Sequence, residues 1–237
     1  MRETADIETS SDGYARRFSG PAGEWMLQVQ TSIILSFLRD MPGARVLDVG
    51  GGHAQTAIPL VEAGHQVVVL GSDPSCANRL KPYLDSCKLS FVSGSLTEIP
   101  FEDRSFDVVL SLRLVPHCEQ WRTLLKEMGR VANDRVIFDY PCVESINCLA
   151  GFFFERKRKF EGNTRTWLSF KNREIRDVLT SEGWGNVELR KQFFWPMALH
   201  RMLNRPGFSK TLEGITGAVG LRWCFGSPVL VNARRGH

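Results

Sequence analysis

The stretch VLDVGGGH, residues 46–53, decides how this chain of 237 residues folds. Residues 45–49 are rich in residues that favour β-strands, and three glycines follow them directly. A helical stretch then runs to Ala63. Glycines at such a junction let the backbone approach a ligand closely and aim its amide groups at it. The stretch therefore predicts a ligand-binding turn between a strand and a helix.

Apolar periodicity on either side of this turn predicts alternating helices and strands. The remaining elements expected up to residue 139 are helices over 24–40 and 119–131, a helix opened by Pro74, and strands over 67–70, 89–92, 106–112 and 135–138. Such alternation indicates a parallel sheet covered on both faces. After Asp139 the pattern changes to an irregular segment 142–168, a helix 172–181 and two late strands, 187–194 and 229–233.

Composition predicts a soluble single domain. The chain is 43% hydrophobic and 24% charged, and its net charge of +4 indicates an ordinary solvated surface. No apolar run reaches the roughly 18 to 20 residues that a spanning helix needs. Residues 1–12 are polar and acidic, unlike a signal or transit peptide, so we expect a cytoplasmic protein. Six scattered cysteines without a close pair predict no metal site and no disulfide framework.

Two common nucleotide motifs do not fit the glycine turn. A phosphate-binding loop would continue into Gly-Lys-Ser or Gly-Lys-Thr, which is absent after Gly52. A dinucleotide fingerprint would place glycine where Gln55 stands, and it has no use for an acidic residue two places before the first glycine. Asp48 is that acidic residue.

VLDVGGG at 46–52 resembles the first motif of class I S-adenosylmethionine-dependent methyltransferases. Residues 99–109, IPFEDRSFDVV, are similar to the family's segment before and within its fourth strand, and His117 in LVPH falls where many members carry a histidine. The resemblance covers about 44–139. It implies a Rossmann-like, doubly wound α/β/α sandwich of seven mostly parallel strands with an antiparallel edge pair. It also implies S-adenosylmethionine as cofactor, S-adenosylhomocysteine as product, and no metal.

On this resemblance, residues 1–237 form one methyltransferase domain. We expect an N-terminal lid and helix over 1–43, a cofactor-binding core over 44–139, and a substrate cap with the C-terminal strands over 140–237. The residues expected at the cofactor are Tyr14, Arg17, Asp48, Gly50, Gly51, Gly52, Gly71, Ser72, Asp73, Ser95, Leu96 and Leu112.

Two positions depart from the family pattern. Gly71 stands where members carry the acid that holds the ribose, although Asp73 lies close enough in sequence to substitute. Ser95 stands where an aspartate commonly reads the adenine. These departures motivate an alternative function, a non-catalytic cofactor-binding or regulatory protein on a degenerate methyltransferase fold.

His117 is the expected general base, which only a hydroxyl or carbon acceptor requires; the alternative is a capping or packing histidine. Arg113 and Tyr140 are expected with His117 at the substrate, although Arg113 can instead pair with an acidic neighbour. An arginine of the lid, such as Arg17, would pair with the cofactor carboxylate or belong to a solvated basic patch.

The expected acceptor is a small, largely apolar molecule, methylated on oxygen or carbon beneath segments 142–168 and 195–226. Cys142 resembles the nucleophile of RNA cytosine methyltransferases, but the supporting motifs and any RNA-binding extension are absent, so no nucleic-acid partner is expected. The apolar and then cationic segment 146–159 predicts a cap helix or, alternatively, a peripheral membrane or lipid contact. The aromatic residues expected in the cap core, or along an apolar substrate wall, are Phe193, Phe194, Trp195 and Trp223, together with Met197.

Overall fold

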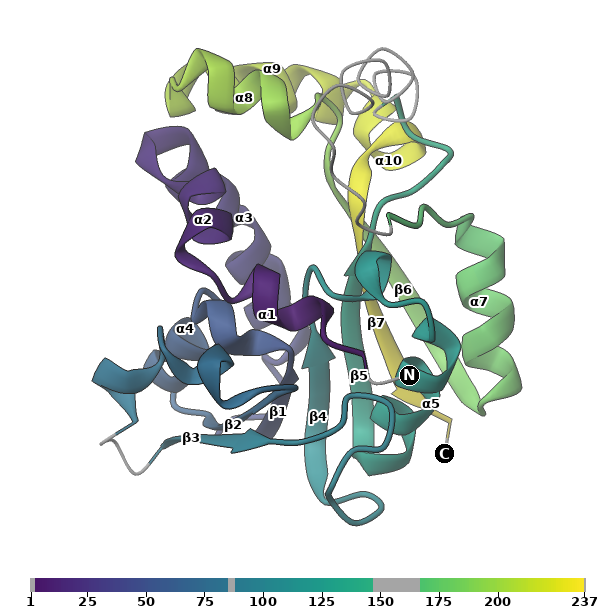
Figure 1. Cartoon of the computed structure of the whole chain (residues 1–237). Coiled ribbons are helices and arrows are strands. Elements are labelled where there is room, and N and C mark those ends of the chain that lie inside the picture. Colours follow the sequence, from purple (N-terminus) through teal and green to yellow (C-terminus); the bar gives the residue numbers. More distant parts are fainter. Residues whose placement is uncertain (1–2, 85–87, 147–166, 237) are drawn as a thin grey trace.

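The computed structural model describes residues 3–84, 88–146 and 167–236. Seven strands form one sheet in the order β3-β2-β1-β4-β5-β7-β6 (Figure 1). Their bounds are β1 Arg45–Val49, β2 Gln66–Gly71, β3 Leu89–Ser93, β4 Phe106–Ser111, β5 Ala132–Tyr140, β6 Trp184–Phe193 and β7 Ser227–Arg235. Strands β1 to β5 run parallel, and β7 is antiparallel to both β5 and β6. This arrangement confirms the mostly parallel sheet with an antiparallel pair at its edge.

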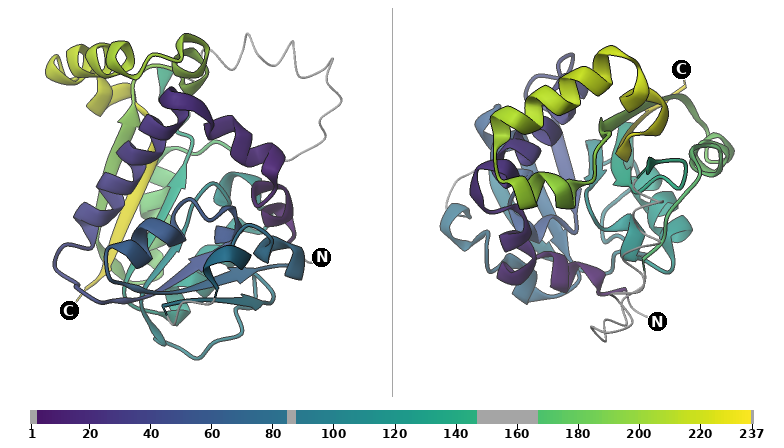
Figure 2. Two further views of the ribbon diagram at one scale, coloured as in Figure 1. Left: turned by 90° about the vertical axis from the view of Figure 1, so that its left-hand side faces the viewer. Right: turned by 90° about the horizontal axis from the view of Figure 1, so that it is seen from above.

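Helices cover both faces of the sheet, as the alternating pattern predicts (Figure 2). On one face α3 (Gly20–Phe37) and α4 (Ala57–Glu62) pack Phe37 and Leu60 against the strands. On the other face α5 (Trp121–Val131) and α7 (Asn172–Ser181) pack Leu124 and Ile175. The central strands β1, β2 and β4 are therefore buried on both sides, which explains their largely apolar sequences.

The order of the strands creates a crevice at their carboxyl ends. From β1 the chain proceeds to β2 and β3 on one side, and then returns to place β4 and β5 on the other. Open α/β sheets bind ligands where the strand order reverses in this way. The turn after β1 and the segment after β4 lie at this point.

The N-terminal segment is more helical than the sequence indicates. It forms α1 (Ala5–Thr9), α2 (Asp12–Ala15) and the 3₁₀ turn η1 (Arg16–Phe18), and α3 then begins at Gly20. The first two helices are too short to show an apolar period. The helix expected after Pro74 is wrong: the chain forms only the short 3₁₀ turns η3 (Pro74–Ala77) and η4 (Lys81–Tyr83).

The long connection between β6 and β7 is helical over most of its length. It forms α8 (Met197–Leu203), α9 (Pro206–Ala218) and α10 (Leu221–Phe225), which lie at the upper end of the molecule in Figure 1. The expected cap segment 142–168 lies mostly outside the described residues, and so does the apolar and cationic segment 146–159. Among the residues that are described, no helix is both long enough and apolar enough to span a bilayer. The division into lid, core and cap stays a prediction.

Arg135 in β5 joins the sheet to the end of α3. Its buried guanidinium donates hydrogen bonds to the carbonyl oxygen of Phe37 and, at 3.0 and 2.9 Å, to both carboxylate oxygens of Asp40. These bonds hold the pKa of Asp40 below its usual value. One buried cation thus satisfies the last carbonyl of the helix and anchors the loop that leads into β1.

We expect Arg135→Leu to lower the free energy of unfolding by about 1–3 kcal/mol, because a buried carbonyl loses its charged donor. Urea denaturation followed by circular dichroism measures this change. Arg39→Leu, at an exposed neighbouring position, is the matched control and is expected to be nearly neutral. Equal stability of the two variants would contradict the anchoring role.

Candidate active site at the carboxyl edge of the sheet

The turn after β1 can be built only from glycines. Gly50 has a φ of +75°, in the left-handed region. A Cβ on Gly51 would lie 2.1 Å from the Asp48 carboxyl group, and one on Gly52 would lie 2.3 Å from the carbonyl oxygen of Cys76. The turn continues through the 3₁₀ turn η2 (Gly51–His53) into α4. The structure therefore confirms a close-packed glycine turn between a strand and a helix.

Asp48 carries a carboxylate that is fully buried at the end of β1. Neither of its oxygens has a hydrogen-bond partner within the described part of the chain. Burial raises the pKa of Asp48 to about 7, and the positive charge of Arg113 limits the rise. A buried acceptor without a donor costs free energy, so its presence beside a glycine turn marks a place where a ligand can supply the missing donors.

Helix α1 lies directly on this turn. The buried carboxylate of Asp6 accepts hydrogen bonds from the Ser72 hydroxyl and from its backbone N–H, the latter at 2.6 Å. Ser10 follows α1, and its hydroxyl oxygen would lie 2.3 Å from a Cβ on Gly52. Neither Asp6 nor Ser10 stands out in the sequence, because each contacts a residue more than 40 positions away along the chain. The N-terminus thus covers the backbone that the sequence assigns to a ligand.

The end of β2 has no room for a side chain at Gly71. A Cβ there would lie 2.7 Å from the Cβ of Cys76 and 2.9 Å from the ring of Phe91. The carboxylate of Asp73 accepts a hydrogen bond from the backbone N–H of Ser75 at 2.8 Å and so caps η3. The family's acidic side chain therefore cannot stand at Gly71, and Asp73 has a structural use.

The other expected cofactor residues lie at neighbouring strand ends. Ser95, after β3, accepts a hydrogen bond from the backbone N–H of Thr97 at 3.3 Å. Leu96 and Leu112 are fully buried in the two core clusters of the sheet. Leu96 follows β3 and Leu112 follows β4, so both lie at carboxyl ends of strands on either side of β1 and β2.

A cavity of about 290 Å³ lies at the carboxyl ends of β4 and β5, lined mainly by apolar and aromatic side chains, and none of its lining residues belongs to the glycine turn. Six residues predicted from the sequence line it: Tyr14, Arg17, Arg113, His117, Tyr140 and Met197. The other lining residues are Phe18, Met26, Gln30, Pro116, Asp139, Pro141, Trp167, Gln192, Arg201, Ser227 and Pro228. The cavity thus joins the N-terminal segment, the ends of β4 and β5, and helix α8.

His117 ends the 3₁₀ turn η5 (Val115–His117) and is only 6% exposed. Its ring meets that of Trp167 edge to face, with the ring centroids 4.9 Å apart. The side chain thus lines the cavity and packs within its wall. This position is consistent with both roles expected from the sequence, a general base and a packing residue.

Arg113 leaves β4 with a φ of +61° and lies between several buried polar groups. Its backbone N–H donates to Asp139 at 2.6 Å, and its guanidinium donates to the Gln55 side chain at 2.6 Å. A second guanidinium nitrogen lies 3.2 Å from the imidazole Nε2 of His53. The burial of His53 and the charge of Arg113 hold the pKa of this imidazole well below its usual value. Arg113 therefore organises the site, and only part of it faces the cavity.

Two lining residues complete the base of the cavity. Asp139, at the end of β5, also accepts a hydrogen bond from Gln30 of α3 at 3.3 Å, and burial raises its pKa. Tyr140 donates its hydroxyl proton to Asn172 at 2.7 Å, and burial raises the pKa of its phenol. The sequence gives no sign of Gln30, which looks like an ordinary position on α3. In the described residues no group of three or more side chains is arranged to hold a metal ion.

Solved structures identify the class of fold. Magnesium protoporphyrin IX methyltransferase from Synechocystis PCC 6803, with bound S-adenosylhomocysteine, matches with a TM-score of 0.66, 17% identity and coverage of 96% of each chain. A methyltransferase dependent on S-adenosylmethionine from Archaeoglobus fulgidus matches with a TM-score of 0.59 and 14% identity, covering 88% of this chain and 94% of that one. The fold is that of class I S-adenosylmethionine-dependent methyltransferases.

The sequence supports this class independently of the fold. Residues 47–138 match the family model described as a methyltransferase domain. This part of the chain therefore carries a methyltransferase domain, as the motif at 46–52 predicts.

Curated relatives share this domain over part of their length. A methyltransferase of Mycolicibacterium gilvum is 41% identical over 87 residues, 36% of this chain and 34% of that protein. Phthiotriol/phenolphthiotriol dimycocerosates methyltransferase of Mycobacterium tuberculosis is 32% identical over 121 residues, 48% of this chain and 43% of that one. Demethylmenaquinone methyltransferase of Renibacterium salmoninarum is 31% identical over 102 residues, 42% of this chain and 41% of that one. The chain thus matches less than half the length of each.

The burial of Asp48 predicts a particular pH dependence of stability. Because its pKa in the folded protein, about 7, lies above the ordinary value of 3.8, the folded state binds the proton more tightly than the unfolded state does. The contribution of Asp48 to stability is therefore fully present at low pH, declines between about pH 4 and 7 by at most about 1.4 kcal/mol per pH unit, and then stays constant.

Asp48→Asn removes this titration, so the variant should gain free energy of unfolding relative to the natural protein as pH rises to about 7. Urea denaturation of both proteins between pH 4.5 and 8 measures the difference. Asp177→Asn, at an exposed position, is the control and should give a difference that changes little with pH. A pH-independent difference for Asp48→Asn would show that the carboxyl group keeps an ordinary pKa.

Proposed function

We propose that this chain transfers a methyl group from S-adenosylmethionine to a small, largely apolar acceptor, on oxygen or on carbon. One observation carries the proposal: the unpaired carboxylate of Asp48 and the glycine turn share the carboxyl edge of the sheet with a mainly apolar cavity that contains His117. The carboxylate and the glycine turn are suited to a polar, cationic cofactor, and the cavity is suited to an apolar acceptor.

The cofactor-binding residues of the proposal are those expected from the sequence at the ends of β1, β2, β3 and β4. Asp48 fits a cofactor that carries an ammonium group, because its buried oxygens lack donors. The backbone N–H of Gly50 already donates to the carbonyl oxygen of Leu70 at 2.8 Å, so the N–H groups proposed for the cofactor are those of Gly51 and Gly52, and Tyr14 and Arg17 cover the site from the N-terminal segment. When bound, the cofactor supplies a methyl group on a positively charged sulfur atom.

The chain's own contribution to the reaction is alignment, exclusion of water and proton removal. Displacement at a methyl group needs the acceptor atom held in line, and a closed aromatic cavity favours such placement. For a hydroxyl or an acidic carbon, a ring nitrogen of His117 takes the proton that the acceptor loses. Phe18, Trp167 and Met197 enclose the cavity and limit the entry of water.

The lining of the cavity and the names of two relatives support an apolar acceptor. Those names specify phthiotriol/phenolphthiotriol dimycocerosates and demethylmenaquinone as the molecules that these proteins methylate. In the cavity described here, the only carboxylate is that of Asp139, and it already accepts two hydrogen bonds. An apolar body without a cationic group is the acceptor that this lining fits best.

A second candidate function is a regulatory or binding protein that does not catalyse methyl transfer. Two observations favour it: Gly71 leaves no room for the family's acidic side chain, and Asp6 and Ser10 occupy the space over the glycine turn. The two functions differ in whether a cofactor can displace α1.

Titration calorimetry with S-adenosylhomocysteine tests cofactor binding directly. Because Asp6 holds the N–H and hydroxyl of Ser72, a ligand at this place competes with α1, and Asp6→Ala should tighten binding by roughly tenfold. Asp48→Ala should weaken it. Asp12→Ala, which alters only an exposed ion pair of the same segment, is the control.

If neither the natural protein nor Asp6→Ala releases or absorbs heat on titration, the non-catalytic function is the better assignment. Weaker binding by Asp6→Ala would instead show that this carboxylate belongs to the cofactor site.

The role of His117 can be tested once an acceptor is found by incubating the protein and labelled cofactor with fractionated cell extract. We expect His117→Ala to leave the affinity for S-adenosylhomocysteine nearly unchanged and to slow single-turnover transfer by about 10² to 10⁴. The rising limb of the pH profile should disappear with the base.

His117→Phe separates this role from packing, since the phenyl ring can keep the contact with Trp167 but cannot accept a proton. Transfer restored by phenylalanine would make His117 a packing residue. Label found only in RNA or protein would rule out a small acceptor.

A further inference from the structure

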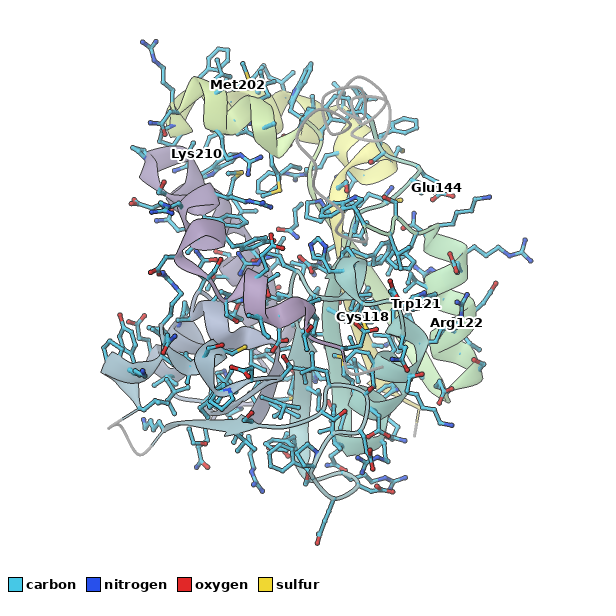
Figure 3. The ribbon with its side chains drawn as sticks, viewed as in Figure 1. Cys118, Trp121, Arg122, Glu144, Met202 and Lys210 are labelled. Carbon is cyan, nitrogen blue, oxygen red and sulfur yellow. The ribbon has the colours of Figure 1, made fainter. Side chains whose placement is uncertain are left out.

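Helices α8, α9 and α10 expose an unusual amount of apolar surface. Of the eleven large hydrophobic side chains that are exposed in the described residues, seven belong to these helices and an eighth, Val219, directly follows α9. They are Met202, Leu203, Phe208, Ile215, Val219, Leu221, Trp223 and Phe225, and we call them the apolar cap face. Met202 is 82% exposed and lies on α8 at the end of the molecule farthest from the sheet (Figure 3).

Helix α9 is amphipathic, but it buries polar side chains and exposes apolar ones. It buries Ser209, Glu213 and Thr216, while it exposes Phe208 and Ile215. A helix that packs on a protein core normally does the opposite. The exposure of its apolar side chains therefore follows from the way the helix packs on the protein, with its polar face inward.

The buried polar side chains of α9 are fully engaged. Glu213 accepts hydrogen bonds at 2.9 Å from the backbone N–H groups of Phe194 and Trp195, which follow β6. His200 of α8 lies between the two polar residues of α9, with its Nε2 3.0 Å from Glu213 and its Nδ1 2.9 Å from Ser209. Hydrogen bonds thus fix the orientation of the helices, and this orientation turns the apolar side chains outward.

The charges on the same helices have one sign. Arg201, Arg205 and Lys210 are exposed, and Arg222 is partly buried. The only carboxylate between residues 197 and 226 is Glu213, which is buried. A partner for this surface must accept apolar side chains and carry negative charge.

We propose that the apolar cap face docks on the surface of an anionic lipid bilayer. These helices combine exposed aromatic and aliphatic side chains with exposed arginine and lysine, and this is the combination that enters the boundary between headgroups and acyl chains. A second copy of the chain is the poorer occupant, because a symmetric contact would oppose the same arginines and lysine to one another.

Docking here would place the membrane next to the cavity. Met197 and Arg201 of α8 line the cavity, while Met202 of the same helix belongs to the apolar cap face. An apolar molecule leaving the bilayer would therefore meet the cavity without a long path through water. This consequence rests on the proposed function, but the docking itself does not.

Co-sedimentation with vesicles tests the proposal without cofactor or acceptor, so its result is independent of methyl transfer. The full chain should bind vesicles that mix phosphatidylglycerol with phosphatidylcholine, and bind pure phosphatidylcholine far more weakly. Binding should decrease as salt is raised, since the cations lie at an exposed surface. Equal binding to both kinds of vesicle, or none to either, would overturn the proposal.

Paired variants identify the surface. Phe208→Ser with Ile215→Ser, and separately Arg205→Glu with Lys210→Glu, should each reduce the partition into mixed vesicles by at least about tenfold. All four side chains are exposed, so folding should persist, which circular dichroism verifies. Tyr83→Ser and Arg39→Glu, at exposed positions outside α8–α10, are the matched controls and should bind as the natural protein does.

Unchanged binding by both paired variants would place any membrane contact elsewhere and overturn the assignment. Light scattering tests whether the apolar cap face instead binds a second copy of the chain. This would be the case if the natural protein is a dimer and the variant with Phe208→Ser and Ile215→Ser is a monomer.

Discussion

The charge of Arg113 organises the carboxyl edge of the sheet. It lowers the pKa of two buried carboxyl groups, Asp48 at the end of β1 and Asp139 at the end of β5, and so opposes the rise in pKa that burial causes in both. Its guanidinium also stacks on Phe18, with 4.6 Å between the guanidinium carbon and the ring centroid. One cation therefore links the glycine turn, the N-terminal segment and the floor of the cavity. Because Arg113 is itself buried, each of these contacts also compensates for its own loss of hydration.

The two carboxyl groups differ in how they are satisfied. Asp139 accepts hydrogen bonds from Arg113 and Gln30, so it is a structural part of the cavity wall. Asp48 accepts none from the described residues and depends on the field of Arg113 alone. A protein selected only for stability would replace such a group with a neutral one. The contrast supports the proposal that Asp48 meets a ligand, whereas the hydrogen bonds of Asp139 hold the shape of the cavity wall.

Much of this architecture could be predicted from local sequence. The strands and the turn at Gly50–Gly52 follow from short-range apolar patterns and from the conformational freedom of glycine, and the parallel sheet then brings Arg113 and His117 to one edge. Asp6 could not be found in this way, since α1 has five residues and its bond to Ser72 spans 66 positions. Contacts of that length depend on the completed fold and leave no periodic signal.

Prediction from the sequence fails differently in the helices α8–α10. The apolar pattern is present there, but the apolar side chains face outward and not into a core. Trp223 was expected in a cap core or along a substrate wall, yet it is 60% exposed, whereas Phe193 and Phe194 are buried as expected. Sequence periodicity locates the faces of a helix, but it cannot tell which face points inward when polar residues find partners there. In α9 the deciding partners are the backbone N–H groups beyond β6 and the imidazole of His200, which only the folded chain brings to Glu213. The hydrogen bonds therefore hold the cap in place, and its apolar side chains remain available for contact with an apolar phase outside the protein.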